Sequence, residues 1–273
     1  MRIKSAVKLL VCGGIIGGSM LVPGVSGGTS AIILGIYDRL VEAVSDIFSD
    51  FKKNAAFLTI VAVGGVVGAV LLSGWIVYLV NLFFAPSMYL FSGAILGSVP
   101  LMVKKSRITK QNLHCLVFAA VGAAAAVGVA KIPFWGDASV DGIGMSIILQ
   151  LLCGFVIAVA LILPGISTSH ILLVLGMYEP ILMAVKQLNI VYLLPVCAGV
   201  LGGILVCTKT LDRAMKQFPS QTYMIIAGFV MASVYDIFPG TVDNALLQSV
   251  CVLLGVVGFA AVCMISLYQS KSE

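Results

Sequence analysis

Long apolar runs separated by short polar segments make up most of the chain. The runs span 55–84, 87–103, 113–130, 143–163, 190–208, 221–237 and 246–268. Several reach the roughly 20 residues that a helix needs to cross the hydrocarbon core of a bilayer. This pattern predicts an all-α polytopic membrane protein.

A further apolar stretch, near the N-terminus, is interrupted by VPGVSGGTS at residues 22–30. Proline and clustered glycines break helices, and unsatisfied backbone groups in lipid are costly. The interruption occurs twice. Residues 23–44 read PGVSGGTSAIILGIYDRLVEAV and residues 164–185 read PGISTSHILLVLGMYEPILMAV, with eight of 22 positions identical. We therefore interpret the break as part of a repeated unit.

The repeat divides the chain into two units, residues 1–130 and residues 131–273. We expect each unit to contain a re-entrant helical hairpin followed by three transmembrane helices. The hairpin tips fall at 23–28 and 164–169. Because a hairpin plus three crossings is an odd number of crossings, the second unit would be inverted relative to the first. The two tips should then meet near the membrane midplane, as in secondary transporters with broken helices.

Lys and Arg fall between the apolar runs, where they act as topology signals. The hairpin arrangement places 14 of the 16 Lys and Arg on the side of the N-terminus, and only Lys131 and Lys186 on the other. We thus expect both termini in the cytoplasm. The predicted cytoplasmic segments are 38–54, 104–112 and 209–220, and the predicted outer segments are 85–86, 131–142, 186–189 and 238–245. Two full crossings in place of each hairpin would preserve the same arrangement of charge.

Composition agrees with a membrane setting and excludes some partners. The 273 residues are 60% hydrophobic and 10% charged, whereas soluble domains carry about 25% charged residues. The net charge of +5 is not arranged as a basic stripe with interleaved aromatics, so we expect no nucleic-acid partner. All seven cysteines lie inside apolar runs without C-x-x-C spacing. We expect no disulfide framework, metal site or cofactor.

Each tip has the chemistry of an anion site. Ser26 and Ser167 are suited to cap new helices, whose first turns leave N–H groups for a ligand. Gly27 and Gly28 would allow close approach to the backbone. Two opposed helix N-termini suit a phosphate group. The candidate substrate-binding residues are Pro23, Gly24, Ser26, Gly27, Gly28, Thr29 and Ser30 in the first tip, and Pro164, Gly165, Ser167, Thr168, Ser169 and His170 in the second.

Charged residues at the hairpin ends are candidates for coupling transport to an ion. Asp38, Arg39 and Glu42 end the first hairpin, and Glu179 aligns with Asp38. Intramembrane carboxylates suggest proton relays, but these positions also fit a solvated hairpin end. His170 could bind phosphate, carry a coupling proton or serve a structural role.

The first tip and its continuation resemble a known family. GGSMLVPGVSGGTSAIILGIYDRLVEAV, with LPGIS and LGMYEPILMAV later in the chain, is similar to the bacterial polyprenyl-phosphate transporters. The resemblance implies a membrane transporter, not an enzyme. Its substrate would be undecaprenyl phosphate, the lipid carrier of cell-wall synthesis, moved from the outer to the inner leaflet of the cytoplasmic membrane.

Other interpretations of the motifs remain open. The same anion site would suit a transporter or channel for a small soluble anion. A membrane enzyme acting on a lipid phosphate would need a nucleophile–base pair or metal ligands. Residues 24–28 also match the G-x-S-x-G nucleophile elbow, but that motif requires a preceding strand. Several other glycines are predicted only to allow close helix packing; these are Gly64, Gly65, Gly68, Gly122, Gly202 and Gly203.

Overall fold

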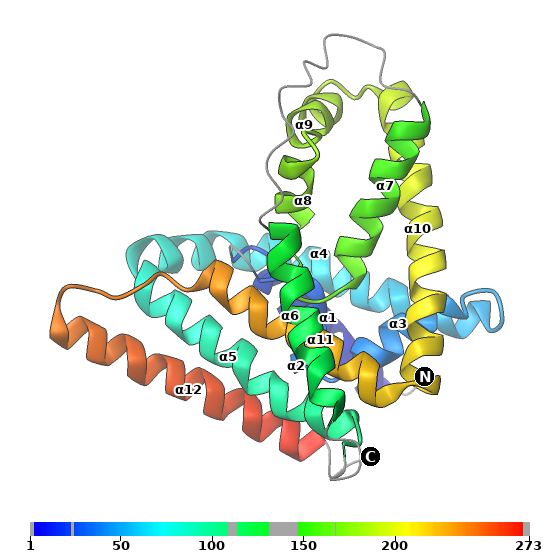
Figure 1. The fold of residues 1–273 in the computed structure, drawn as a ribbon. Coiled ribbons are helices and arrows are strands. Elements are labelled where there is room, and N and C mark those ends of the chain that lie inside the picture. Colours follow the sequence, from blue (N-terminus) through cyan, green and yellow to red (C-terminus); the bar gives the residue numbers. More distant parts are fainter. Residues whose placement is uncertain (1–2, 23–24, 109–113, 131–146, 167, 270–273) are drawn as a thin grey trace.

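The computed structural model is all-helical among the described residues, which confirms the all-α part of the predicted fold class (Figure 1). It describes residues 3–22, 25–108, 114–130, 147–166 and 168–269. These residues form twelve helices: α1 (Ile3–Ser19), α2 (Gly27–Ile33), α3 (Tyr37–Ser45), α4 (Phe51–Leu82), α5 (Phe84–Lys105), α6 (Leu116–Ala130), α7 (Ile147–Ile162), α8 (Thr168–Val174), α9 (Tyr178–Lys186), α10 (Ile190–Gln217), α11 (Pro219–Ile237) and α12 (Ala245–Gln269).

Four of the described helices, α4, α5, α10 and α12, are long and apolar enough to cross a membrane, judged by length and composition. The longest is α4, whose 32 residues extend about 48 Å. Large apolar side chains such as Val70, Leu71 and Trp75 are exposed along it. A continuous apolar surface of this kind suits lipid rather than water. The protein is a multi-pass membrane protein.

The turn between α4 and α5 lies at Phe83, two residues before the break predicted at 85–86. Pro86 is therefore inside the first turn of α5. A proline is tolerated there because the N–H groups of a first turn have no intrahelical partner.

The described helices fall into two series whose first five helices have similar lengths, whereas the sixth helices differ, with 15 and 25 residues. Helices α1 to α6 contain 17, 7, 9, 32, 22 and 15 residues, and α7 to α12 contain 16, 7, 9, 28, 19 and 25. Packing follows the same correspondence. Helix α1 packs against α4 as α7 packs against α10, and α5 packs against α12 as α11 packs against α6. The last helix of each series thus packs against the fifth helix of the other.

Glycines bring the paired helices into backbone contact. A Cβ atom added to Gly17 of α1 would lie 1.9 Å from the carbonyl oxygen of Gly65 on α4. An added Cβ at Gly203 of α10 would meet Phe155 and Ala158 of α7. The packing role predicted for glycines is confirmed at Gly64, Gly68, Gly122 and Gly203, where an added Cβ would clash with a neighbouring helix. At Gly65 an added Cβ would lie 3.7 Å from the Gly13 carbonyl oxygen, an ordinary contact. The predicted role is wrong for Gly202, because a Cβ there would meet nothing within 4 Å.

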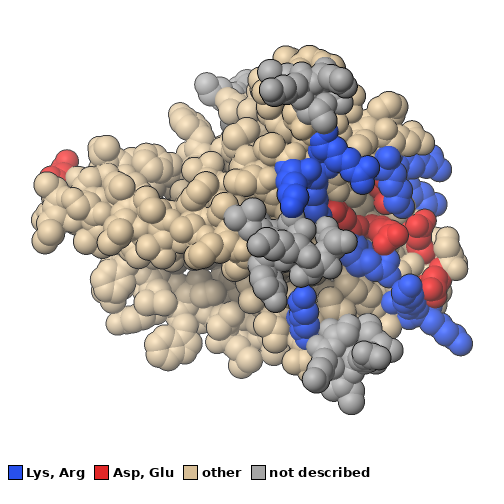
Figure 2. Space-filling model, turned by 90° about the horizontal axis from the view of Figure 1, so that it is seen from below, with Lys and Arg blue, Asp and Glu red and all other residues tan. Residues whose placement is uncertain are grey.

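Lys and Arg side chains gather at one end of the molecule, together with most of the visible Asp and Glu (Figure 2). The first turn of α4 and the last turns of α5 and α10 supply basic residues to this end, including Lys52, Lys105 and Lys216. We call it the basic face. Helices α7, α8, α9 and the first half of α10 extend away from it (Figure 1).

Candidate functional site: two hairpin tips above an apolar cavity

The first tip is built around Ser26, which caps α2 as predicted. Its backbone is extended, with φ −89° and ψ 149°, and its Oγ accepts a hydrogen bond from the N–H of Thr29 at 3.2 Å. This bond satisfies one of the N–H groups that a helix start leaves without a partner. Pro23 and Gly24, the other predicted binding residues before the cap, lie outside the described residues.

The second tip depends on the backbone of Gly165. Its φ is +83°, a conformation that favours glycine, and an added Cβ would lie 2.4 Å from the carbonyl oxygen of Phe229 on α11. Pro164 beside it is fully buried. Ser167 lies outside the described residues, as do the side chains of Ser169 and His170, so the predicted roles of these three remain predictions.

The two tips contact each other directly. The N–H of Gly165 donates a hydrogen bond of 3.2 Å to Ser26 Oγ, across 139 residues of sequence. A Cβ added to Gly28 would lie 3.2 Å from Cα of Pro164. The expectation that the tips meet is therefore confirmed.

Ser26 Oγ is the centre of this contact. It accepts N–H groups from both Thr29 and Gly165, and it lies 2.9 Å from Thr29 Oγ1. A serine hydroxyl has one proton and two lone pairs. With both lone pairs accepting N–H groups, the proton of Ser26 is donated to Thr29 Oγ1.

The predicted tip hydroxyls do not all face the same way. Thr29 and Ser30 are buried, at 1% and 4% exposure. Ser30 Oγ lies 2.6 Å from the Oγ of Ser19 at the end of α1. Ser19 was not among the predicted site residues, although its position directly before the tip was a signal. These hydroxyls hold the tip together, and the ligand role predicted for Thr29 and Ser30 stays a prediction.

A cavity of about 860 Å³ lies beside the tips. Its walls come from α1, α3, α4, α7 and α10, and most of its lining is aliphatic. The tips contribute Ser26, Gly27, Gly28 and Thr168 to its surface. Three further lining residues, Met20, Val66 and Leu161, are exposed at 54%, 66% and 44%. Apolar side chains that border the cavity are therefore exposed on the surface of the molecule.

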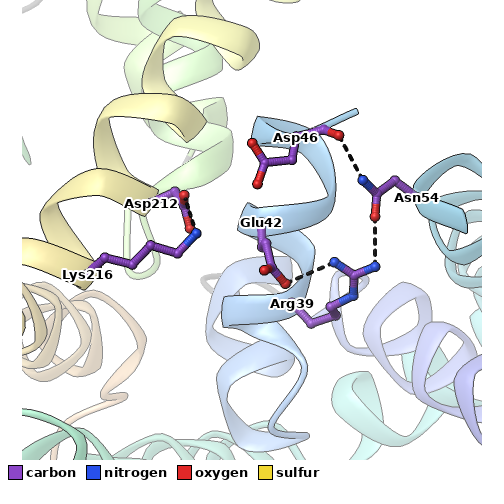
Figure 3. Close-up of polar contacts among 6 residues, drawn as sticks. All are labelled: Arg39, Glu42, Asp46, Asn54, Asp212 and Lys216. Atoms are coloured by element: carbon purple, nitrogen blue, oxygen red, sulfur yellow. Dashed lines mark hydrogen bonds and ion pairs between the residues drawn. The ribbon is translucent and has the colours of Figure 1, made fainter. Parts of the chain in front are cut away.

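The charged end of the first hairpin is tied to several other helices. Asp38 on α3 accepts hydrogen bonds from Lys105 Nζ of α5 at 2.5 Å and from Tyr223 Oη of α11 at 2.9 Å. Arg39 pairs with Glu42 at 2.9 Å and donates to Asn54 Oδ1 of α4 at 2.7 Å (Figure 3). These side chains are half-buried members of a network, rather than a simple solvated hairpin end.

The network continues onto α10, where sequence reasoning identified nothing. Asp212 is buried and pairs with Lys216 at 2.8 Å. Figure 3 shows Asp46, at the end of α3, directed toward this pair. Within the described part of the chain, no three His, Cys, Asp or Glu side chains are grouped so that they could hold a metal ion.

Comparison with known proteins identifies the family. Residues 16–254 match the model of a family described as undecaprenyl phosphate translocase-like. The chain belongs to this undecaprenyl phosphate translocase-like family. The matched region begins within α1 and ends within α12, so it contains both tips, the cavity and α3. The resemblance found in the tip motifs is confirmed.

Two relatives of the chain are named polyprenyl-phosphate transporters. The protein from Staphylococcus aureus is 29% identical over 269 residues, which cover 94% of this chain and 95% of the relative. The protein from Vibrio cholerae is 31% identical over 239 residues, covering 82% of this chain and 74% of the relative. No solved structure matches the chain.

Proposed function

We propose that the protein moves undecaprenyl phosphate from the outer to the inner leaflet of the bacterial cytoplasmic membrane. Membership of the undecaprenyl phosphate translocase-like family supports the substrate, and the names of the two relatives support transport rather than catalysis. The observation that carries the proposal is the contact between the two tips beside an apolar cavity that is bordered by exposed apolar side chains. A lipid with a charged headgroup needs polar groups that bind the phosphate and an apolar surface beside them.

The architecture of the proposal is a pair of inverted repeats, residues 1–130 and residues 131–273. The similar lengths of the first five helices of each series, and the paired packing of the two series, support it. In each repeat, the first three helices form a re-entrant hairpin and the next three cross the membrane. The two tips then meet near the midplane of the membrane, where the broken helices of such transporters bind substrate. The basic face is cytoplasmic, and so are both termini.

The phosphate is held at the tips. The N–H groups of Thr29 and Ser30 are already bonded to Ser26, so the ligand would meet the N–H groups of Gly27 and Gly28, which precede the first intrahelical bond. Thr168 lines the same cavity, and its hydroxyl would be a further donor. A phosphate surrounded by aliphatic walls needs such donors, because an unpaired charge in an apolar site is very costly.

The polyprenyl tail stays in the lipid. The headgroup enters sideways between the exposed side chains of Met20, Val66 and Leu161, while the tail remains among the acyl chains. A transporter for a small soluble anion would need no such apolar border, which favours a lipid substrate. Among the described residues, the partners of Ser26 Oγ are Thr29 and the N–H of Gly165, and neither is the base that an activated serine nucleophile requires.

Leaflet exchange in liposomes tests the proposal. The purified protein is reconstituted with fluorescent undecaprenyl phosphate, and an impermeant quencher reports the fraction in the outer leaflet over time, with and without a pH gradient. We expect exchange well above that of protein-free liposomes. Exchange at the protein-free rate under every gradient would contradict the proposal. Inorganic phosphate uptake by the same liposomes would instead support the soluble-anion alternative.

A further inference from the structure

Helix α3 forms a wall between the cavity and the basic face. Its apolar side, made by Tyr37, Leu40, Val41 and Val44, lines the cavity. Its opposite side carries Asp38, Arg39 and Glu42, which face the ends of the surrounding helices. Because apolar and polar residues occupy opposite sides of this short helix, α3 separates the apolar cavity from the charged residues of the basic face.

Contacts to four helices hold α3 in this place. Asp38 joins it to Lys105 of α5 and Tyr223 of α11. Arg39 joins it to α4 through Asn54 and lies 5.2 Å from the centre of the Phe57 ring. The amide of Asn54 donates in turn to the carbonyl oxygen of Asp46 at 2.8 Å. The remaining side packs against α10, where Lys216 interacts electrostatically with Glu42 and Asp46.

The corresponding helix of the second series, α9, lacks these contacts. It packs mainly on its neighbours α8 and α10, and it forms no interface with α4 comparable to that between α3 and α10 among the described residues. Leu182, Met183 and Val185 on α9 are exposed at 41%, 56% and 51%. Both helices follow a glycine with positive φ, Gly35 at 70° and Gly176 at 66°, so the chain enters them through equivalent bends.

We infer that α3 is the gate of the transport path on the basic face, locked by the Asp38–Lys105–Tyr223 and Arg39–Asn54 contacts, and that α9 is the opposite gate in its released position. Release of α3 opens the cavity to the basic face and gives the headgroup its exit. Docking of α9 against α4, through the exposed apolar side chains of α9, accompanies this release. The inference rests on the proposed function, because it assigns the cavity to the path of the lipid headgroup.

Hydrogen–deuterium exchange of the full chain in lipid nanodiscs tests the gate. Lys105→Met removes the lysine that holds Asp38, and we expect the amides of α3 to exchange at least about tenfold faster, since local opening sets their exchange rate. The amides of α9 should exchange at least about threefold more slowly, because the population with α9 docked rises. The amides of α5 and α12 should keep their wild-type rates and so report that the variant is folded.

Two variants serve as controls. Lys105→Arg keeps the charge and should retain the wild-type pattern. Lys209→Met removes an exposed positive charge from α10 and should change neither α3 nor α9. If Lys105→Met fails to fold, Asp38→Asn removes the same ion pair from the other side.

Unchanged exchange of α3 in Lys105→Met would overturn the lock. Faster exchange of α3 with no change in α9 would mean that the opening of α3 is not coupled to the docking of α9, and would also overturn the inference. These measurements need no substrate. A wild-type protein that fails to move undecaprenyl phosphate would therefore overturn the proposed function separately.

Discussion

The two hairpin ends, α3 and α9, share a sequence pattern but differ in their surroundings. YDRLVEAV and YEPILMAV align without gaps, yet Val41 of α3 is almost fully buried, whereas Leu182 at the aligned position of α9 is exposed. The difference follows from a few positions. Pro180 stands where α3 has Arg39, and Met183 stands where it has Glu42. The first hairpin end can form a charged network and the second cannot.

The tips differ in a similar way. The first tip relies on a side chain, because Ser26 Oγ is bonded to both tips. The second relies on a backbone conformation that glycine adopts easily. Gly165 has φ +83° and packs against the carbonyl oxygen of Phe229. One repeat therefore uses side-chain chemistry at the places where the other uses backbone and apolar surface.

The largest effect is expected at the second tip. Gly165→Ala combines a left-handed conformation, worth about 1–2 kcal/mol, with a clash against the carbonyl oxygen of Phe229, worth about 1–3 kcal/mol. We expect the free energy of unfolding to fall by about 2–5 kcal/mol, measured by titration with SDS in mixed micelles. Gly240→Ala is the control, because Gly240 has φ +80° with nothing within 4 Å of an added Cβ. Equal losses in the two variants would show that the packing against α11 is unimportant.

A smaller effect is expected at Arg39. Arg39→Ala removes hydrogen bonds to Glu42 and Asn54 and the contact with the Phe57 ring. Since the Arg39 side chain is one third exposed, we expect a loss of about 1–2 kcal/mol in the same titration. Met183→Ala, at the α9 position aligned with Glu42, should cost less than about 0.5 kcal/mol. A larger loss at Met183 than at Arg39 would reverse the comparison.

The smallest effects are expected at the aligned carboxylates. Asp38→Asn weakens the pairing with Lys105 and should cost about 1 kcal/mol in the SDS titration. Glu179 is exposed on α9, so Glu179→Gln should change the unfolding free energy by less than about 0.5 kcal/mol. If the two substitutions had the same effect, the network at α3 would contribute nothing that an exposed hairpin end lacks.

Sequence patterns predicted the features that depend on local chemistry. The apolar runs predicted the helices, the Pro-Gly pairs predicted the breaks between them, and the serine of the first tip predicted the cap of α2 at Ser26. The repeat predicted that the tips meet, as the bond between Ser26 and Gly165 confirms. Other features depend on how helices pack. The partnership of Arg39 with Asn54, and the position of Asp212 opposite α3, arise from tertiary contacts that no single-sequence period encodes. Asp38 and Glu179 align in sequence, but only the folded chain shows that Asp38 is bonded to Lys105 and Tyr223 while Glu179 is exposed.

The central claim is that the headgroup phosphate binds where the tips meet, and Ser26 tests it most directly. Aspartate and asparagine can both accept the N–H groups of Thr29 and Gly165, so both should preserve the cap and the contact between tips. Aspartate also places a fixed negative charge beside the phosphate, and two like charges about 4 Å apart repel by about 4 kcal/mol at an effective dielectric of 20, roughly a thousandfold in affinity. We expect Ser26→Asn to retain most of the leaflet exchange of undecaprenyl phosphate per folded protein, and Ser26→Asp to lose it. Equal exchange by the two variants would contradict the account and place the phosphate elsewhere.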